Sequence, residues 1–122
     1  MNAAMASDYD EPRNIKRRHL VYYLEVYNAE TGDLLGNLVD ITTRGCKIVS
    51  RDPIPRKQTL MLKLVLPEGF FHENVLVFEA KSVWSANDIN PDFFDTGFEV
   101  PHLSLESRKV IRRLIERVGF ND

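Results

Sequence analysis

HLVYYLEVYN, residues 19–28, is the stretch on which the prediction of the fold rests. It is rich in β-branched and aromatic residues, which favour strands over helices. From Val21 onward polar and apolar residues alternate imperfectly along the chain. One face carries Tyr23, Glu25 and Tyr27, and the other carries Tyr22, Leu24 and Val26. Because a period of two places one face on a core and the other towards solvent, the segment predicts a half-buried β-strand.

Downstream of this segment the chain forms further short apolar runs, separated by turn residues such as Gly32-Asp33 and Pro67-Glu68-Gly69. Six short strands at this spacing predict an all-β fold, and we expect a six-stranded antiparallel β-barrel. The five further strands are expected at LLGNLVDITT (34–43), GCKIVS (45–50), TLMLKLVL (59–66), NVLVFEAKSVW (74–84) and FFDTGFEV (93–100).

The last part of the chain changes to a helical period. Ser104 is suited to the N-cap, Glu106 favours the first turn, and Gly119 fits the position after the helix end. We therefore predict a C-terminal helix over residues 104–118 that packs on the barrel or closes one of its ends. Its apolar stripe consists of Val110, Ile111, Leu114, Ile115 and Val118.

Length and composition limit the class of protein. A chain of 122 residues with 43% hydrophobic and 28% charged residues is expected to form one globular domain, here residues 13–119, behind a disordered tail at 1–12. A single cysteine excludes an internal disulfide, and no apolar run is long enough to span a bilayer, so we expect a cytoplasmic protein without membrane insertion. The net charge of −2 argues against binding of a nucleic-acid polymer.

Positive charge is concentrated in two places on this acidic chain. RNIKRRHL, residues 13–20, holds four cations within six residues and no acid, directly ahead of the first strand. The predicted helix carries five more, for which a solvated outer face is the first interpretation and a partner-docking surface the alternative. Local basic patches of this kind indicate local anion sites.

Sequence motifs for catalysis are lacking. His19, His72 and His102 are far apart and have no cysteine or acid at metal-ligand spacing, and there is no P-loop or GxGxxG motif. Cys46 is expected to be a buried, inert thiol, and acidic pairs such as Asp92 with Asp95 are expected to be solvated in a polar turn. We therefore predict a protein that is not an enzyme and that has no metal or cofactor.

Two motifs remain. Arg13 and Arg17 form R-x-x-x-R, and Asp40-Ile41-Thr42-Thr43-Arg44-Gly45 forms D-x-T-x-x-G, starting 23 residues after Arg17. Each is weak alone, because paired arginines are common and the second pattern also describes an ordinary turn. Together, in this order, they are much more specific.

In these motifs the sequence resembles the PilZ domain family, the bacterial receptors for cyclic di-GMP. That family carries R-x-x-x-R before its first strand and [D/N]-x-S-x-x-G after a following strand. Later landmarks agree: Val83-Trp84 ends a long strand, Gly97-Phe98-Glu99 follows, and a basic amphipathic helix closes the domain. The resemblance covers residues 11–119. It departs at Thr42, where the family prefers serine, so the hydroxyl is kept and a methyl group is added.

The resemblance implies a clamp for cyclic di-GMP, which carries two guanines and two negative charges. An arginine can fork onto guanine or a phosphate, and an aspartate can accept from the guanine N1–H and amino group. A threonine hydroxyl adds an adaptable donor or acceptor, and glycine permits close approach. Trp84 is expected in the core, with stacking on the ligand as the alternative. The ligand-binding candidates are Arg13, Arg17, Arg18, Asp40, Thr42 and Gly45, with Arg44 as a further candidate.

The resemblance further implies a receptor that acts on a partner protein, through an N-terminal segment that becomes ordered when the nucleotide binds. Such partners include motility, pilus, secretion and polysaccharide machinery. One alternative is a PilZ-like interaction module that does not bind nucleotide. A second is a small β-barrel that binds RNA or single-stranded DNA, for which residues 19–28 have the aromatics but few of the cations.

Overall fold

The computed structural model describes the backbone of residues 18–69 and 71–121, and the side chains of residues 23–69 and 71–117. The tail predicted at 1–12 and the arginines Arg13 and Arg17 therefore lie outside the described residues. Seven strands and one helix follow one another along the described chain. They are β2 (Arg18–Asn28), β3 (Leu34–Ile41), β4 (Gly45–Ser50), β5 (Thr59–Val65), β6 (Val75–Asn87), β7 (Phe94–Glu99), α1 (Leu105–Val118) and β8 (Gly119–Asn121).

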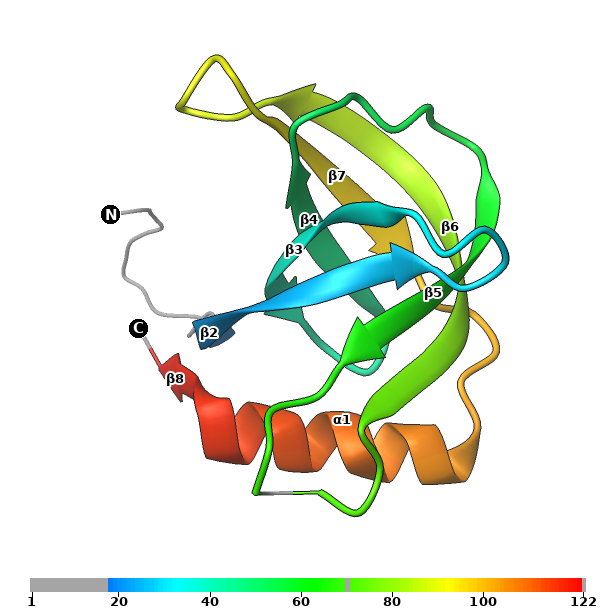
Figure 1. The fold of residues 1–122 in the computed structure, drawn as a ribbon, viewed down its shortest axis with the longest axis vertical. Coiled ribbons are helices and arrows are strands. Elements are labelled where there is room, and N and C mark those ends of the chain that lie inside the picture. Colours follow the sequence, from blue (N-terminus) through cyan, green and yellow to red (C-terminus); the bar gives the residue numbers. More distant parts are fainter. Residues whose placement is uncertain (1–17, 70, 122) are drawn as a thin grey trace.

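Six of these strands close into an antiparallel barrel (Figure 1). The order around the barrel is β3-β4-β7-β6-β5-β2, and β2 pairs back with β3 to complete the ring. The six-stranded antiparallel barrel with a C-terminal helix is thus confirmed. Closure leaves few strand edges unpaired, which suits a small all-β domain.

The alternation predicted for residues 19–28 places its side chains as expected where side chains are described. Leu24 and Val26 are buried, whereas Tyr23 is 72% exposed. The other strands alternate in the same way, so apolar side chains fill the barrel from all six strands. The largest fully buried side chains include Leu38, Ile41, Ile48, Leu62 and Leu64.

Helix α1 closes one end of the barrel (Figure 1). It begins after Ser104, whose hydroxyl oxygen accepts a hydrogen bond from the Ser107 N–H at 3.1 Å, as predicted for an N-cap. Ile111 and Leu114 are fully buried and Val110 nearly so, which confirms the predicted apolar stripe. Nowhere in the described part of the chain is there a helix with the length and hydropathy that crossing a bilayer requires.

One irregularity in the barrel moves Trp84 from the inside to the outside. Strand β6 buries alternate residues up to Ser82, which would also bury Trp84. However, Ser82 pairs with Phe98 and Trp84 already pairs with Gly97, so β6 carries one extra residue here. This bulge turns Trp84 outwards, where it is 44% exposed. The prediction of a core tryptophan was therefore wrong.

The bulge is held in place by Ser82. Its hydroxyl donates to the Pro55 carbonyl at 2.6 Å and accepts from the Gln58 N–H at 3.0 Å. The loop between β4 and β5 is thereby fixed against β6, and a buried polar group is satisfied.

The short strand β8 was not predicted. It extends the chain directly from the helix and pairs with the start of β2, with His19 opposite Phe120 and Leu20 opposite Gly119. The end of the described chain therefore lies against the first described residues.

Candidate functional site

A row of residues crosses four strands on the outer face of the barrel. Asp40 on β3 lies opposite Lys47 on β4, and Lys47 lies opposite Gly97 on β7. Trp84 on β6 lies on the other side of Gly97. Because neighbouring strands are about 4.8 Å apart, the row spans about 14 Å. Strand pairing thus brings together the carboxylate of Asp40, the ammonium of Lys47 and the indole of Trp84.

The indole of Trp84 lies across Gly97. A Cβ atom built at Gly97 would overlap the indole Nε1, so only glycine leaves room for the ring in this position. One side of the indole thereby packs on the β7 backbone while nearly half of the residue remains exposed. The arrangement presents an aromatic surface beside Asp40 and Lys47.

Asp40 and Lys47 form an ion pair at one end of the row. The Lys47 ammonium nitrogen is 3.7 Å from Asp40 Oδ2, and the two side chains are only 28% and 21% exposed. Sequence reasoning did not single out Lys47. The signal was present, since Lys47 is the only charged residue of GCKIVS and stands at an outward position of its alternation.

The turn between β3 and β4 is stabilised by Thr42. Its hydroxyl oxygen accepts from the Arg44 N–H at 3.1 Å and the Gly45 N–H at 3.2 Å, while the Thr42 N–H donates to the Gly45 carbonyl at 2.8 Å. The hydroxyl of the D-x-T-x-x-G motif thus fixes the turn that follows Asp40.

Gly45 ends this turn against β7. A Cβ atom at Gly45 would overlap the Phe98 carbonyl oxygen, so glycine is required here for the packing of two strands. The exposed Arg44 is fixed through its backbone, because its carbonyl accepts from the Val100 N–H at 2.8 Å. Both residues keep the motif rigid on the barrel.

A shallow cavity of about 370 Å³ lies over this row, within the range of small-ligand sites. It brings together four of the predicted site residues: Asp40, Thr42, Arg44 and Gly45. Sequence reasoning had not assigned Lys47 or Gly97, which also line it. Arg18 is described only through its backbone, at the start of β2.

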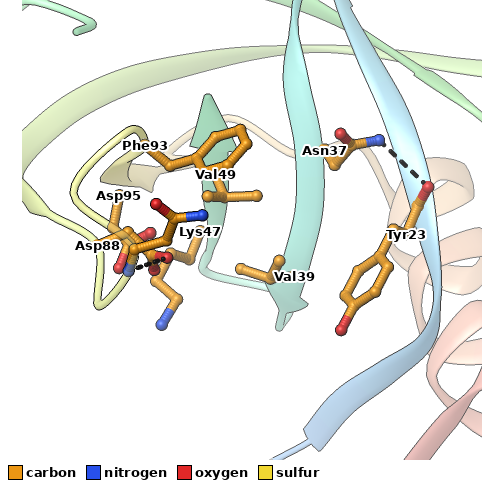
Figure 2. A pocket seen from close by; sticks show the side chains of 9 residues that line it. Tyr23, Asn37, Val39, Lys47, Val49, Asp88, Phe93 and Asp95 are labelled. Atoms are coloured by element: carbon orange, nitrogen blue, oxygen red, sulfur yellow. Dashed lines mark hydrogen bonds between the residues drawn. The ribbon is translucent and has the colours of Figure 1, made fainter. Parts of the chain in front are cut away.

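A second cavity of about 460 Å³ adjoins the first, and Lys47 lines both. Figure 2 shows Asp88 and Asp95 close together on one side of it and Tyr23 with Asn37 on the other. The Asn37 amide donates to the Tyr23 carbonyl at 3.3 Å. The cavity thus combines aromatic walls with a pair of carboxyl groups.

The carboxyl pair corrects an expectation from the sequence. Asp92 is exposed in the turn, but Asp95 belongs to β7, is half-buried, and interacts with Asp88. Burial raises the pKa of Asp95 to about 6, and the hydrogen bond and negative charge of Asp88 act in the same direction. The Lys47 ammonium opposes them in part. Asp95 is therefore not the solvated carboxylate that its polar surroundings in sequence predicted.

The only cysteine of the sequence behaves as the sequence indicated. Cys46 is buried, and burial raises the pKa of its thiol to about 12, which keeps it protonated and inert. Among the residues that the structure describes, no three His, Cys, Asp or Glu side chains are grouped so that they could hold a metal ion.

A model of the PilZ domain family matches residues 11–117 of the chain. The chain belongs to the PilZ domain family. The match spans both motifs, the barrel and nearly all of α1. No curated protein matches the sequence.

Two solved structures share the PilZ fold. The Bacillus subtilis inhibitor of motility MotI/DgrA is 20% identical, with a TM-score of 0.64 over 86% of this chain. This chain spans only about half (53%) of the MotI/DgrA chain. The PilZ domain of YcgR from Escherichia coli, whose structure is described with c-di-GMP, is 13% identical. Its TM-score is 0.60, over 87% of this chain and 91% of that domain. At identities of 20% and 13%, these similarities show a shared fold and nothing more.

Proposed function

We propose that this PilZ domain is a cytoplasmic cyclic di-GMP receptor that passes the signal to a partner protein. The observation that carries the proposal is the row Asp40, Lys47, Gly97 and Trp84 beside the D-x-T-x-x-G turn. It combines the three kinds of group that a cyclic guanine dinucleotide requires: a carboxylate, a cation and an aromatic surface.

Each group has a matching part of the ligand. The Asp40 carboxylate can accept from the N1–H and amino group of one guanine, a pattern that adenine does not offer. The indole of Trp84 offers its exposed surface for stacking on a base. Lys47 can contact a phosphate between the bases as a point charge. The cavity is shallow, so the ligand can approach the row from solvent without movement of the strands.

The position of the R-x-x-x-R motif supports the same site. His19 at the start of β2 pairs with Asp40 across the β2–β3 ladder. Arg17 is two residues ahead of His19, so its Cα atom lies within about 7 Å of the His19 Cα atom. Because the motif precedes this strand by so few residues, we expect Arg17 to reach the ligand site, where a guanidinium can fork onto a guanine or a phosphate.

Signal transfer would follow from the same tether. A nucleotide held by Arg13 and Arg17 on one side and by Asp40 on the other would order residues 11–17 against the barrel, while Arg18 already belongs to β2, and would create a new surface. A partner from motility, pilus, secretion or polysaccharide machinery would recognise that surface. The domain itself then acts as an adaptor and not as an enzyme.

Titration calorimetry with cyclic di-GMP tests the proposal. We expect a Kd well below about 100 μM, or about −5.5 kcal/mol, and much weaker binding of cyclic di-AMP. Arg13→Ala, Arg17→Ala and Asp40→Ala should each lose about 2 kcal/mol or more, because each removes a charge-assisted contact. Arg56→Ala is the matched control, since Arg56 is exposed in the β4–β5 loop and lines neither cavity.

Three results would contradict the proposal. Absence of binding at millimolar ligand would favour a PilZ interaction module that does not use nucleotide. Equal affinity for the two dinucleotides would show that guanine is not read. Equal losses in Arg56→Ala and Arg17→Ala would reduce the role of the motif to general charge attraction.

A further inference from the structure

We propose that Asp95, which lines only the second cavity, determines the affinity of the adjoining nucleotide site, so that cyclic di-GMP binds more tightly when this carboxyl carries a proton. The inference rests on the proposed function and adds an affinity-determining residue outside both motifs.

Lys47 connects the two cavities physically. Its side chain lines both, and its ammonium is 3.7 Å from Asp40 Oδ2. Lys47 lies opposite Gly97 on β7, and Asp95 precedes Gly97 by two residues on the same outer face. Diagonal neighbours of this kind are about 7–8 Å apart at their Cα atoms, within reach of a lysine side chain. One ammonium is thus placed between the carboxyl groups of Asp40 and Asp95.

The charge of Asp95 is adjustable because of its surroundings. Asp88, in the loop between β6 and β7, lines the same cavity, and its side-chain hydrogen bonding and negative charge both raise the pKa of Asp95. Burial, Asp88 and Asp40 together raise the pKa of Asp95 to about 6 against the opposing charge of Lys47. On β6 the residue opposite Asp95 is the uncharged Ala86.

The charge of Asp95 affects how strongly Lys47 can attract an anionic ligand. With Asp95 ionised, the negative charges of both Asp40 and Asp95 act on Lys47, and Asp88 lines the same cavity. Protonation of Asp95 removes one of these charges, so the ammonium can contact a phosphate at a lower electrostatic cost although its ion pair with Asp40 remains. A dianion bound within a Debye length of this change should gain roughly three- to tenfold in affinity. Because the pKa is raised, the gain appears as the pH falls through about 6.

A second titratable group makes a direct comparison necessary. His19 pairs with Asp40 across the β2–β3 ladder, and histidine titrates in the same pH range. A pH-dependent affinity of the wild-type domain would not by itself distinguish His19 from Asp95. Variants of each residue separate the two sources.

The experiment is titration calorimetry with cyclic di-GMP at pH 5.5 and 7.5 on the wild type, Asp95→Asn, Asp92→Asn and His19→Gln. At pH 7.5 we expect Asp95→Asn to bind roughly three- to tenfold more tightly than the wild type, with little further gain at pH 5.5. Asp92→Asn removes the same charge from the exposed turn beside the cavity, and its affinity should stay within about twofold. His19→Gln should keep the Asp95-dependent gain.

Carboxyl carbon NMR of Asp95 adds a readout that a purely structural role would not move. By linkage, a ligand that binds the protonated form more tightly must raise the apparent pKa of Asp95 when it is bound. An unchanged pKa would overturn the inference, and so would an Asp95→Asn affinity equal to that of Asp92→Asn. Normal binding without these effects leaves the proposed function standing, whereas no binding by any protein at either pH refutes both.

Discussion

Residues of β3, β4 and β7 point alternately into the barrel and out of it, and the side chains on the two faces differ in their chemistry. Inside, Leu38, Ile48 and Phe98 are buried in a core that excludes water. Outside, Lys47 and Asp95 line open cavities beside a half-exposed tryptophan. The inner face is determined by volume and can be substituted only at a cost in stability. The outer face does not have to fill a core, so packing of the core does not explain why Lys47, Asp95 and the neighbouring Trp84 of β6 lie there.

The largest expected effect is on the inner face. Ile48→Ala removes a fully buried side chain and should lower the free energy of unfolding by about 3 kcal/mol. Val49→Ala, the next residue on the outer face, should cost less than about 1 kcal/mol. Urea unfolding of both variants measures the difference. Similar losses in the two would mean that the outer face is also part of the folding core.

On the outer face, Trp84→Ala should weaken binding of cyclic di-GMP by about 2 kcal/mol, because stacking of a base on an aromatic ring is lost. Its effect on unfolding should be smaller than that of Ile48→Ala, since the ring is 44% exposed. Calorimetry gives the affinity, and Trp84→Phe is the control that keeps a ring. Wild-type affinity in Trp84→Ala would remove the indole from the site.

Gly97→Ala tests whether the position of the indole matters. The added methyl group would overlap the ring, and its displacement should cost about 1–2 kcal/mol in binding and be visible in the emission of the chain's single tryptophan. In a Trp84→Ala background the same change should cost almost nothing in binding, because the two residues act as one unit. Equal costs in both backgrounds would show that Gly97 acts independently.

Asp95→Asn should raise the free energy of unfolding at pH 7.5 by about 1 kcal/mol, after allowance for solvent screening of a half-exposed group. The sign follows from the pKa: since folding raises it to about 6, the ionised form is the less stable one, and stability falls as the pH rises from about 4 through 6. At pH 4 the variant and the wild type should be equal within error in thermal unfolding. A larger gain at pH 4 than at pH 7.5 would contradict this account.

The smallest effect is expected for Thr42→Ser. Serine keeps the oxygen that accepts from the Arg44 and Gly45 N–H groups, so the turn should hold and binding should change by less than about 0.5 kcal/mol, towards tighter if at all. A clear loss of affinity measured by calorimetry would mean that the threonine methyl group contributes useful packing.

The strands and the helix could be predicted because they follow from local patterns. The alternation in residues 19–28 and the Ser104 cap each depend on neighbours along the chain. The cap is confirmed, and so is the alternation over residues 23–28, where side chains are described. The side on which Trp84 lies could not be predicted. A bulge adds one residue against the partner strand, and nothing in the spacing of SVW distinguishes it from a regular strand.

The candidate site was predictable only as far as its motif. Asp40, Thr42, Arg44 and Gly45, which the resemblance indicated, line one cavity, and their role in ligand binding stays a prediction. Pairing between strands brings Lys47 to this cavity and Asp95 to the adjoining one, and the pKa of Asp95 depends on Asp88, which comes from a loop. Register and burial of this kind arise only when the barrel closes, so they cannot be derived from one segment at a time.

The pairing of β8 with β2 has a use in protein engineering. Arg18 lies opposite Asn121, so the first and last described residues are neighbours in one ladder and could be joined by a short linker. The turn between Asn28 and Asp33 closes on its own hydrogen bonds and lines neither cavity, which makes it a suitable place for new chain ends. A circularly permuted chain opened there would retain the pairings between β2 and β8, and a linker that contains residues 13–17 would hold the basic segment between these two strands.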